Sequence, residues 1–96
     1  MPAICRGQKK DLDIVHCEVP KRLEMSPDVF VNDIGISRQG DDNHPHKGPG
    51  CTLHQAPITT GSPTVFINDK GCGRIGDDVD YCTRVATGSP NTFAGP

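Results

Sequence analysis

Three aspartates in this chain are each followed, five positions later, by a side chain that can bind a metal ion. The pairs are Asp11 with His16, Asp41 with His46, and Asp77 with Cys82. If the three segments surround a common axis, their ligands converge on it, and His54 at the end of a long loop supplies a fourth donor. Nitrogen and sulfur donors in a closed tetrahedral shell suit zinc. The spacing therefore predicts one structural zinc ion bound by His16, His46, His54 and Cys82.

Neighbouring side chains leave this ligand set open. In His44-Pro45-His46 either histidine can point inward, so His44 is the alternative to His46. Cys17 and Cys51 lie next to or near predicted ligands, and either can replace one of them. An isolated histidine in a polar loop is usually a solvated side chain. Two of the four histidines here stand at repeat-equivalent positions, which favours metal binding.

The acidic residues favour a structural site over a catalytic one. A catalytic zinc keeps an open coordination position and has a general acid or base beside it, as in the pattern His-Glu-x-x-His. Glu18 and Glu24 are the two glutamates of the chain, and neither stands in such a pattern. The repeated Gly-Asp-Asp sequences, which contribute Asp41, Asp42, Asp77 and Asp78, are better explained as turns in which aspartate caps backbone N–H groups.

A duplicated stretch must position these ligands. Residues 26–42, SPDVFVNDIGISRQGDD, recur as residues 62–78, SPTVFINDKGCGRIGDD, and eleven of the seventeen positions are identical. A repeat of this kind indicates one supersecondary unit that is used more than once around a shared core.

Each copy predicts a β-hairpin. Residues 29–32 are β-branched or aromatic and form the first strand, because they follow Ser-Pro and precede Asn-Asp-x-Gly. Residues 36–38 return as the second strand, and Gly35 supplies the positive φ that a tight turn demands. The second copy has the same parts, namely residues 65–68, Gly71 and residues 72–74.

The two ends of the chain predict a third unit. Residues 89–95, SPNTFAG, repeat the opening of the duplicated stretch but stop after one strand, and residues 2–6, PAICR, are similar to the return arm 35–38. We expect residues 89–96 and 1–8 to form this unit together, so that three pseudo-equivalent hairpin units surround one axis.

Length and composition predict a single small all-β domain, residues 1–96, with a modest core. Hydrophobic residues make up 33% of the chain, which has 11 Gly, 9 Pro and no Trp. Such a domain usually needs a staple, which can be a disulfide, a metal or a partner chain.

Charge and cysteine content bound the function further. The net charge of −2 is scattered, and without a basic stripe we expect no nucleic-acid partner. No apolar leader opens the chain, so we expect synthesis in the cytoplasm without a cleavable signal. In that reducing compartment, the five cysteines favour metal ligands over bridges. Cys5 and Cys72 are expected to be small buried hydrophobic side chains.

The residues resemble one known family, the PAAR-repeat proteins. The resemblance rests on the doubled unit S-P-x-V-F-V/I-N-D-x-G-x-x-R-x-G-D, on the ligand five residues beyond each Gly-Asp, and on the terminal S-P-N-T-F-A-G. It covers essentially the whole chain. The Pro-Ala-Ala-Arg motif itself is degenerate, since Gly35-Ile36-Ser37-Arg38 and Gly71-Cys72-Gly73-Arg74 keep only the arginine.

The resemblance implies a small β cone closed by its N- and C-terminal strands, with zinc held near the apex by three histidines and one cysteine. Its base docks, one copy per trimer, on a trimeric β-helical spike. The chain would be a monomer on its own and part of a phage tail baseplate in the virion, where it helps the spike pierce the bacterial envelope. It would touch the target membrane transiently and would not be an enzyme.

Three alternatives remain. A spike tip or effector adaptor of a type VI secretion system is the nearest. The chain has no room for a fused effector domain, so we expect a stand-alone tip, and of the two systems we favour a phage tail. A small zinc-dependent hydrolase and a small extracellular domain with two disulfides are the others. Neither explains why predicted ligands follow the repeats.

Overall fold

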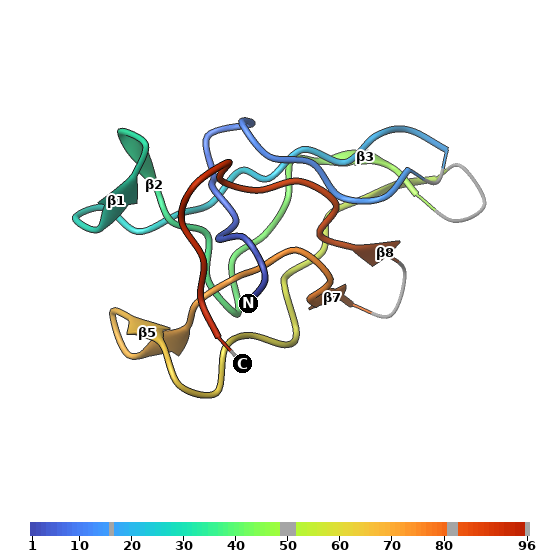
Figure 1. Ribbon diagram of the computed structural model, residues 1–96. Coiled ribbons are helices and arrows are strands. Elements are labelled where there is room, and N and C mark those ends of the chain that lie inside the picture. Colours follow the sequence, from blue (N-terminus) through green and yellow to red (C-terminus); the bar gives the residue numbers. More distant parts are fainter. Residues whose placement is uncertain (16, 49–51, 81–82, 96) are drawn as a thin grey trace.

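The computed structural model in Figure 1 describes residues 1–15, 17–48, 52–80 and 83–95. Within those ranges the chain is all-β, as predicted, with four antiparallel pairs of short strands and no helix. The pairs are β1 (Phe30–Val31) with β2 (Ile34–Gly35), β3 (His46–Lys47) with β4 (Leu53–His54), β5 (Phe66–Ile67) with β6 (Lys70–Gly71), and β7 (Asp78–Val79) with β8 (Thr83–Arg84). Nothing in the described part of the chain is a helix that could cross a membrane.

The two duplicated hairpins turn earlier than the sequence predicted. Their two-residue turns are Asn32-Asp33, with φ of 53° and 64°, and Asn68-Asp69, with φ of 53° and 65°. Two successive positive φ values are typical of the turn that matches strand twist, and Asn and Asp tolerate this region better than other side chains. The prediction that Gly35 and Gly71 supply the positive φ is therefore wrong, because both glycines lie in the returning strands.

Gly35 is needed for space rather than for its backbone angle. A Cβ atom at Gly35 would lie 2.5 Å from the carbonyl oxygen of Ser26 and 2.8 Å from the Met25 side chain. The positive φ glycines are instead Gly40 and Gly76, at 93° and 91°, in the turns that follow the hairpins. In the first of these turns the Asp41 N–H donates to the Arg38 carbonyl at 2.9 Å.

Three short segments, which we call the arms, form a closed ring at the centre of the molecule. The arms are residues 3–6, 35–38 and 71–74. Each donates one central backbone N–H to the next arm: Cys5 to Gly73 at 2.9 Å, Gly73 to Ser37 at 2.9 Å, and Ser37 to Cys5 at 3.0 Å. Antiparallel bridges join the arm ends in the same cyclic order, Ile4 with Arg74, Arg38 with Cys72, and Arg6 with Ile36. The backbone therefore repeats one pairing pattern three times.

The two ends of the chain pair with each other. Ala3 and Phe93 form an antiparallel bridge, the Ile4 N–H donates to the Thr92 carbonyl at 2.9 Å, and the Ala94 N–H donates to the Pro2 carbonyl at 3.0 Å. The bond from Ile4 to Thr92 has an equivalent in each duplicated hairpin. There the Ile36 N–H donates to the Val29 carbonyl at 3.1 Å, and the Cys72 N–H donates to the Val65 carbonyl at 2.9 Å. Figure 1 shows the N-terminal and C-terminal segments side by side near the middle of the molecule.

The core is small and divided. One cluster lies between the arms and the hairpins and consists of Ile4, Val31, Ile36, Ile67, Cys72 and Ala94. The other consists of Cys5, Ala56, Ile58, Val79 and Val85. Figure 1 shows β1, β2 and β5 toward one end of the molecule and β3, β7 and β8 toward the other. The molecule therefore has a hairpin end and a ligand end, and these two names are used below.

Three serines secure the segments that lead into the hairpins. Each hydroxyl oxygen accepts a hydrogen bond from the backbone N–H three residues later in the chain. Ser26 accepts from Val29, Ser62 from Val65 and Ser89 from Thr92, at 2.9–3.0 Å. The hydroxyls donate in turn to neighbouring segments, Ser26 to Asn68 Oδ1, Ser89 to Asn32 Oδ1 and Ser62 to the Gly95 carbonyl. Each serine therefore ties one hairpin segment to the next.

Ser26→Ala should lower the free energy of unfolding by about 1–3 kcal/mol, because the backbone N–H groups of Asp28 and Val29 lose a partly buried acceptor. The matched control is Ser37→Ala. Ser37 is also fully buried, but its hydroxyl has no hydrogen-bond partner among the described residues. Its replacement should leave stability unchanged or raise it. Urea unfolding of both variants measures the difference, and equal losses would contradict the assigned role of Ser26.

Candidate metal centre

Two of the predicted ligands face each other across one strand pair. His46 in β3 is paired with His54 in β4, and the centroids of their imidazole rings lie 4.5 Å apart in an edge-to-face arrangement. His46 is 5% exposed, and His54 is half-buried. The β3–β4 pair therefore brings together two of the predicted nitrogen ligands, which lie eight positions apart in the sequence.

The hydrogen bonding of His46 suits a metal ligand. Its Nδ1 lies 2.7 Å from the carbonyl oxygen of His44, and since a carbonyl only accepts, Nδ1 carries the proton. Metal-binding histidines typically donate one ring N–H to a carbonyl or carboxylate, which fixes the ring and leaves the other nitrogen as the ligand atom. A Cβ atom at Gly48 would collide with the His54 ring, so this glycine provides the space that the imidazole occupies.

Of the other predicted ligands and alternatives, some lie outside the described residues and others lie within them. His16, Cys82 and the alternative Cys51 lie outside the described residues. Within the described part, no group of three His, Cys, Asp or Glu side chains lies close enough together to hold a metal. His44 contributes its carbonyl to His46, and its own N–H donates to the Lys21 carbonyl at 2.7 Å.

Cys17 departs from the expectation that the cysteines act as ligands rather than bridges. It is disulfide-bonded. A sulfur in a disulfide is not a thiolate, so in this form Cys17 cannot replace one of the predicted ligands. The bond is a covalent staple of the kind expected for a domain with a small core.

Cys5 and Cys72 are free thiols that are fully buried, which confirms the prediction that they are small core side chains. Burial raises the pKa of Cys72 to about 11 and raises the pKa of Cys5 well above its ordinary value. Because the thiolate is the nucleophilic form, burial makes both side chains poor nucleophiles near neutral pH.

The aspartates that precede the predicted ligands are anchored by three equivalent arginines. The ion pairs are Arg6 with Asp11 at 2.8 Å, Arg38 with Asp41 at 2.8 Å, and Arg74 with Asp77 at 3.0 Å. Each carboxylate also accepts the backbone N–H of its arginine at 2.7–2.8 Å, which confirms the predicted capping by Asp41 and Asp77. The hydrogen bond to the carboxylate raises the pKa of each arginine, so these guanidinium groups stay charged.

A fully buried ion pair lies between the arms and the predicted metal site. Arg22 Nε is 3.1 Å from Asp13 Oδ1, and both side chains are 0% exposed. The two atoms are not aligned as a hydrogen bond, but Asn43 Nδ2 donates to Asp13 Oδ2 at 3.1 Å. Arg22 also donates to the carbonyls of Asp41 and Ala56. Burial raises the pKa of Asp13, and the charge of Arg22 opposes that shift.

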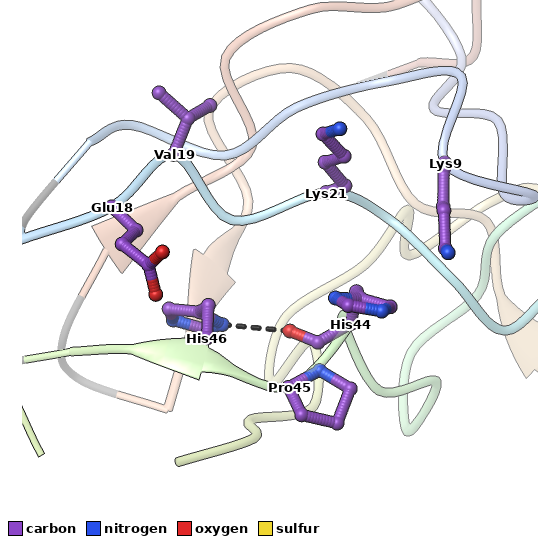
Figure 2. Close-up of a pocket in the computed structure, with 7 residues that line it drawn as sticks. All are labelled: Lys9, Glu18, Val19, Lys21, His44, Pro45 and His46. Atoms are coloured by element: carbon purple, nitrogen blue, oxygen red, sulfur yellow. Dashed lines mark hydrogen bonds between the residues drawn. The ribbon is translucent and has the colours of Figure 1, made fainter. Parts of the chain in front are cut away.

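A pocket of about 210 Å³ opens beside His46. Figure 2 shows its lining, which consists of Lys9, Glu18, Val19, Lys21, His44, Pro45 and His46. The Glu18 carboxylate lies on the His46 side, and the Lys9 ammonium lies on the His44 side (Figure 2). Glu18 Oε1 also accepts the Lys47 N–H at 2.5 Å. Sequence reasoning missed that Glu18 reaches this place, because it belongs to no recognised zinc pattern.

The described residues thus provide two paired histidines, of which His46 has a defined tautomer, together with anchored segments and a pocket of mixed polar and apolar lining beside them. Comparison of the sequence with protein-family models finds no match, and comparison with curated proteins finds none either.

Proposed function

We propose that this chain is a structural tip that caps and sharpens a trimeric β-helical spike of a contractile injection machine. The observation that carries the proposal is the closed ring of the three arms, in which one pairing pattern occurs three times within a single chain. A monomer built this way offers three similar surfaces to three identical chains of a partner. An irregular monomer could not meet a three-fold partner in that manner.

The hairpin end is the proposed base of the tip. The strand pairs β1–β2 and β5–β6 are only two strands wide, so each leaves a backbone edge that a further strand can join. Exposed edges of this kind are an aggregation hazard unless a partner or a charge covers them. Strands of a β-helical spike that continue into these edges would satisfy their N–H and C=O groups.

The ligand end is the proposed apex. Exposed aliphatic side chains occur there, including Ile14 at 51%, Val15 at 59% and Leu53 at 75% exposed. Ile14 is tied to this end by its N–H, which donates to the Arg84 carbonyl beside β8 at 2.8 Å. Such side chains favour transient contact with the target membrane as the spike enters it.

A zinc ion bound by His16, His46, His54 and Cys82 would stiffen that apex, and the three hairpin units would then form the cone that the resemblance implies. A closed four-ligand shell supplies rigidity by linking distant segments, and it requires no turnover. His46 and His54 fit this role, since they are paired and the tautomer of His46 is fixed. We place the tip in the baseplate of a phage tail, with a type VI secretion spike as the alternative.

Binding to a spike tests the function. The purified chain should bind the trimeric β-helical spike protein encoded in the same genome as one copy per trimer, and it should be a monomer when alone. Light scattering after size-exclusion chromatography measures both masses. A metal-free monomer that shows no affinity for the spike would refute the proposal, and three copies per trimer would refute the symmetry argument.

A further inference from the structure

All three phenylalanines of the chain are exposed. The exposed fractions are 57% for Phe30, 60% for Phe66 and 49% for Phe93. In a domain whose core is small, these large apolar side chains would be expected inside if burial alone decided their position. Their shared exposure therefore indicates that these side chains contact something other than the core of this chain.

The three side chains occupy one position of the repeated backbone pattern. Each lies opposite the first residue of an arm, Phe30 opposite Gly35, Phe66 opposite Gly71 and Phe93 opposite Ala3. Each is followed by a buried residue, Val31, Ile67 and Ala94 respectively. Because successive residues of a strand alternate between faces, the phenylalanine points away from the core in all three places.

The residues opposite the phenylalanines leave the rings uncovered. A cross-strand neighbour usually packs on an aromatic ring and buries part of it. Glycine has no side chain and alanine has only a methyl group, so the paired strand cannot cover the rings of Phe30, Phe66 and Phe93. The arrangement displays three rings in equivalent surroundings.

The charged side chains close in sequence to Phe30 and Phe66 are mostly acidic, whereas residues 86–96 around Phe93 carry no charged side chain. Between residues 28 and 35 the charged side chains are Asp28 and Asp33, and between residues 64 and 71 they are Asp69 and Lys70. Asp28 accepts a hydrogen bond from Asn68 Nδ2 at 2.9 Å, and this bond lowers the pKa of its carboxyl. A partner that receives the rings should therefore carry basic side chains beside its apolar pockets.

The segment of Phe93 joins the hairpin end, because Asn91 Oδ1 accepts a hydrogen bond from Asn32 Nδ2 at 2.9 Å and the Gly95 carbonyl accepts one from Thr64 Oγ1 at 2.7 Å. We propose that Phe30, Phe66 and Phe93 are three anchors at this end, and that each enters one of three identical apolar, basic-rimmed pockets on a trimer of identical chains. The inference rests on the proposed function and adds the residues that make the contact. Aromatic side chains dominate the energetics of many protein interfaces. A trimer supplies three equal pockets, whereas a partner without three-fold symmetry has no reason to use the rings equally.

Binding measured by calorimetry with the spike protein encoded in the same genome tests this inference. Phe30→Ala, Phe66→Ala and Phe93→Ala should each raise Kd by about tenfold or more, and by amounts that agree within about threefold. The triple variant should lose measurable binding. Raising the salt concentration from 50 to 500 mM should weaken wild-type binding, because the acidic side chains lose their attraction to the basic rims.

Leu53→Ala is the matched control. Leu53 is an exposed apolar side chain in β4 at the ligand end, so its removal should leave Kd unchanged. All variants should keep the melting temperature of the wild type, since the removed side chains lie outside the core. Wild-type binding that survives in the triple variant, or unequal effects of the three single changes, would overturn the inference and leave the proposed function standing. A wild-type chain that does not bind would overturn both.

Discussion

Replacing Arg22 with methionine should lower the free energy of unfolding by about 3–5 kcal/mol at pH 7, because it leaves the carboxylate of Asp13 buried without its counter-charge. Both side chains are 0% exposed, so water cannot take the place of the guanidinium. A loss of this size is a large part of the stability of a small domain. Urea unfolding of the wild type and the variant measures it.

The effect should depend on pH with a definite sign. Burial raises the pKa of Asp13 in the folded chain, and the loss of the charge of Arg22 raises it further. A carboxyl group whose pKa is raised in the folded state costs nothing while it is protonated in both states. It begins to destabilise the fold as pH rises through its unfolded-state pKa, and the loss is complete once pH exceeds its folded-state pKa. The loss in Arg22→Met should therefore be smaller near pH 4 than at pH 7.

Two further variants separate this explanation from a general effect of charge removal. Arg84→Met removes the ion pair with Asp78, whose side chains are 67% and 45% exposed, and should cost no more than about 1 kcal/mol. The double variant Asp13→Asn/Arg22→Met should recover part of the loss, because no charge is left buried. A loss below about 1 kcal/mol in Arg22→Met alone would show that the pair is not what holds this region together.

The proposed zinc site predicts that removal of zinc has the largest effect on stability. A structural zinc site contributes on the order of 10 kcal/mol to folding, so a chelator should lower the melting temperature of the wild type steeply. His46→Ala and Cys82→Ala should each bind less zinc and unfold at a lower temperature. Atomic absorption on purified protein and thermal scans with and without EDTA measure both quantities.

The redox state must be fixed in that experiment. Cys17 is disulfide-bonded, and all thiols should be kept reduced with a phosphine during the measurement. His44→Ala is the control, since the Nδ1 contact of His46 uses the carbonyl of residue 44 and not its ring. Unchanged zinc stoichiometry in both ligand variants would refute the ligand assignment. A loss of zinc in His44→Ala alone would move the assignment to that residue.

The sequence predicted the all-β class and both duplicated hairpins, because a repeat with alternating β-branched residues leaves few other structures. It did not place the turns correctly. The expectation that glycine supplies a positive φ favoured Gly35, whereas Asn32 and Asp33 adopt it at lower cost to the strand that follows. Gly35 is needed because the chain at Ser26 passes close to it, and that approach is a tertiary contact.

The candidate site was predictable in part. The spacing after Asp41 led to His46. In the structure His46 lies opposite His54, because their strands β3 and β4 are paired. The buried pair of Arg22 and Asp13 gave no local signal, because its two residues meet only when separate loops pack together. The place of Glu18 beside His46 was hidden for the same reason, since it follows from the path of the chain and not from a motif.

The bridge between Ala3 and Phe93 has a consequence for how the chain is made. Residues 3–6 must meet the arm 71–74 to close the ring, and Ala3 must meet Phe93 to form the bridge. Contacts between such distant residues slow folding, because a long loop must close before they form. During synthesis the first arm therefore waits for almost the whole chain to leave the ribosome. Until then its Cys5 and Ile4 stay exposed to solvent and to other nascent chains.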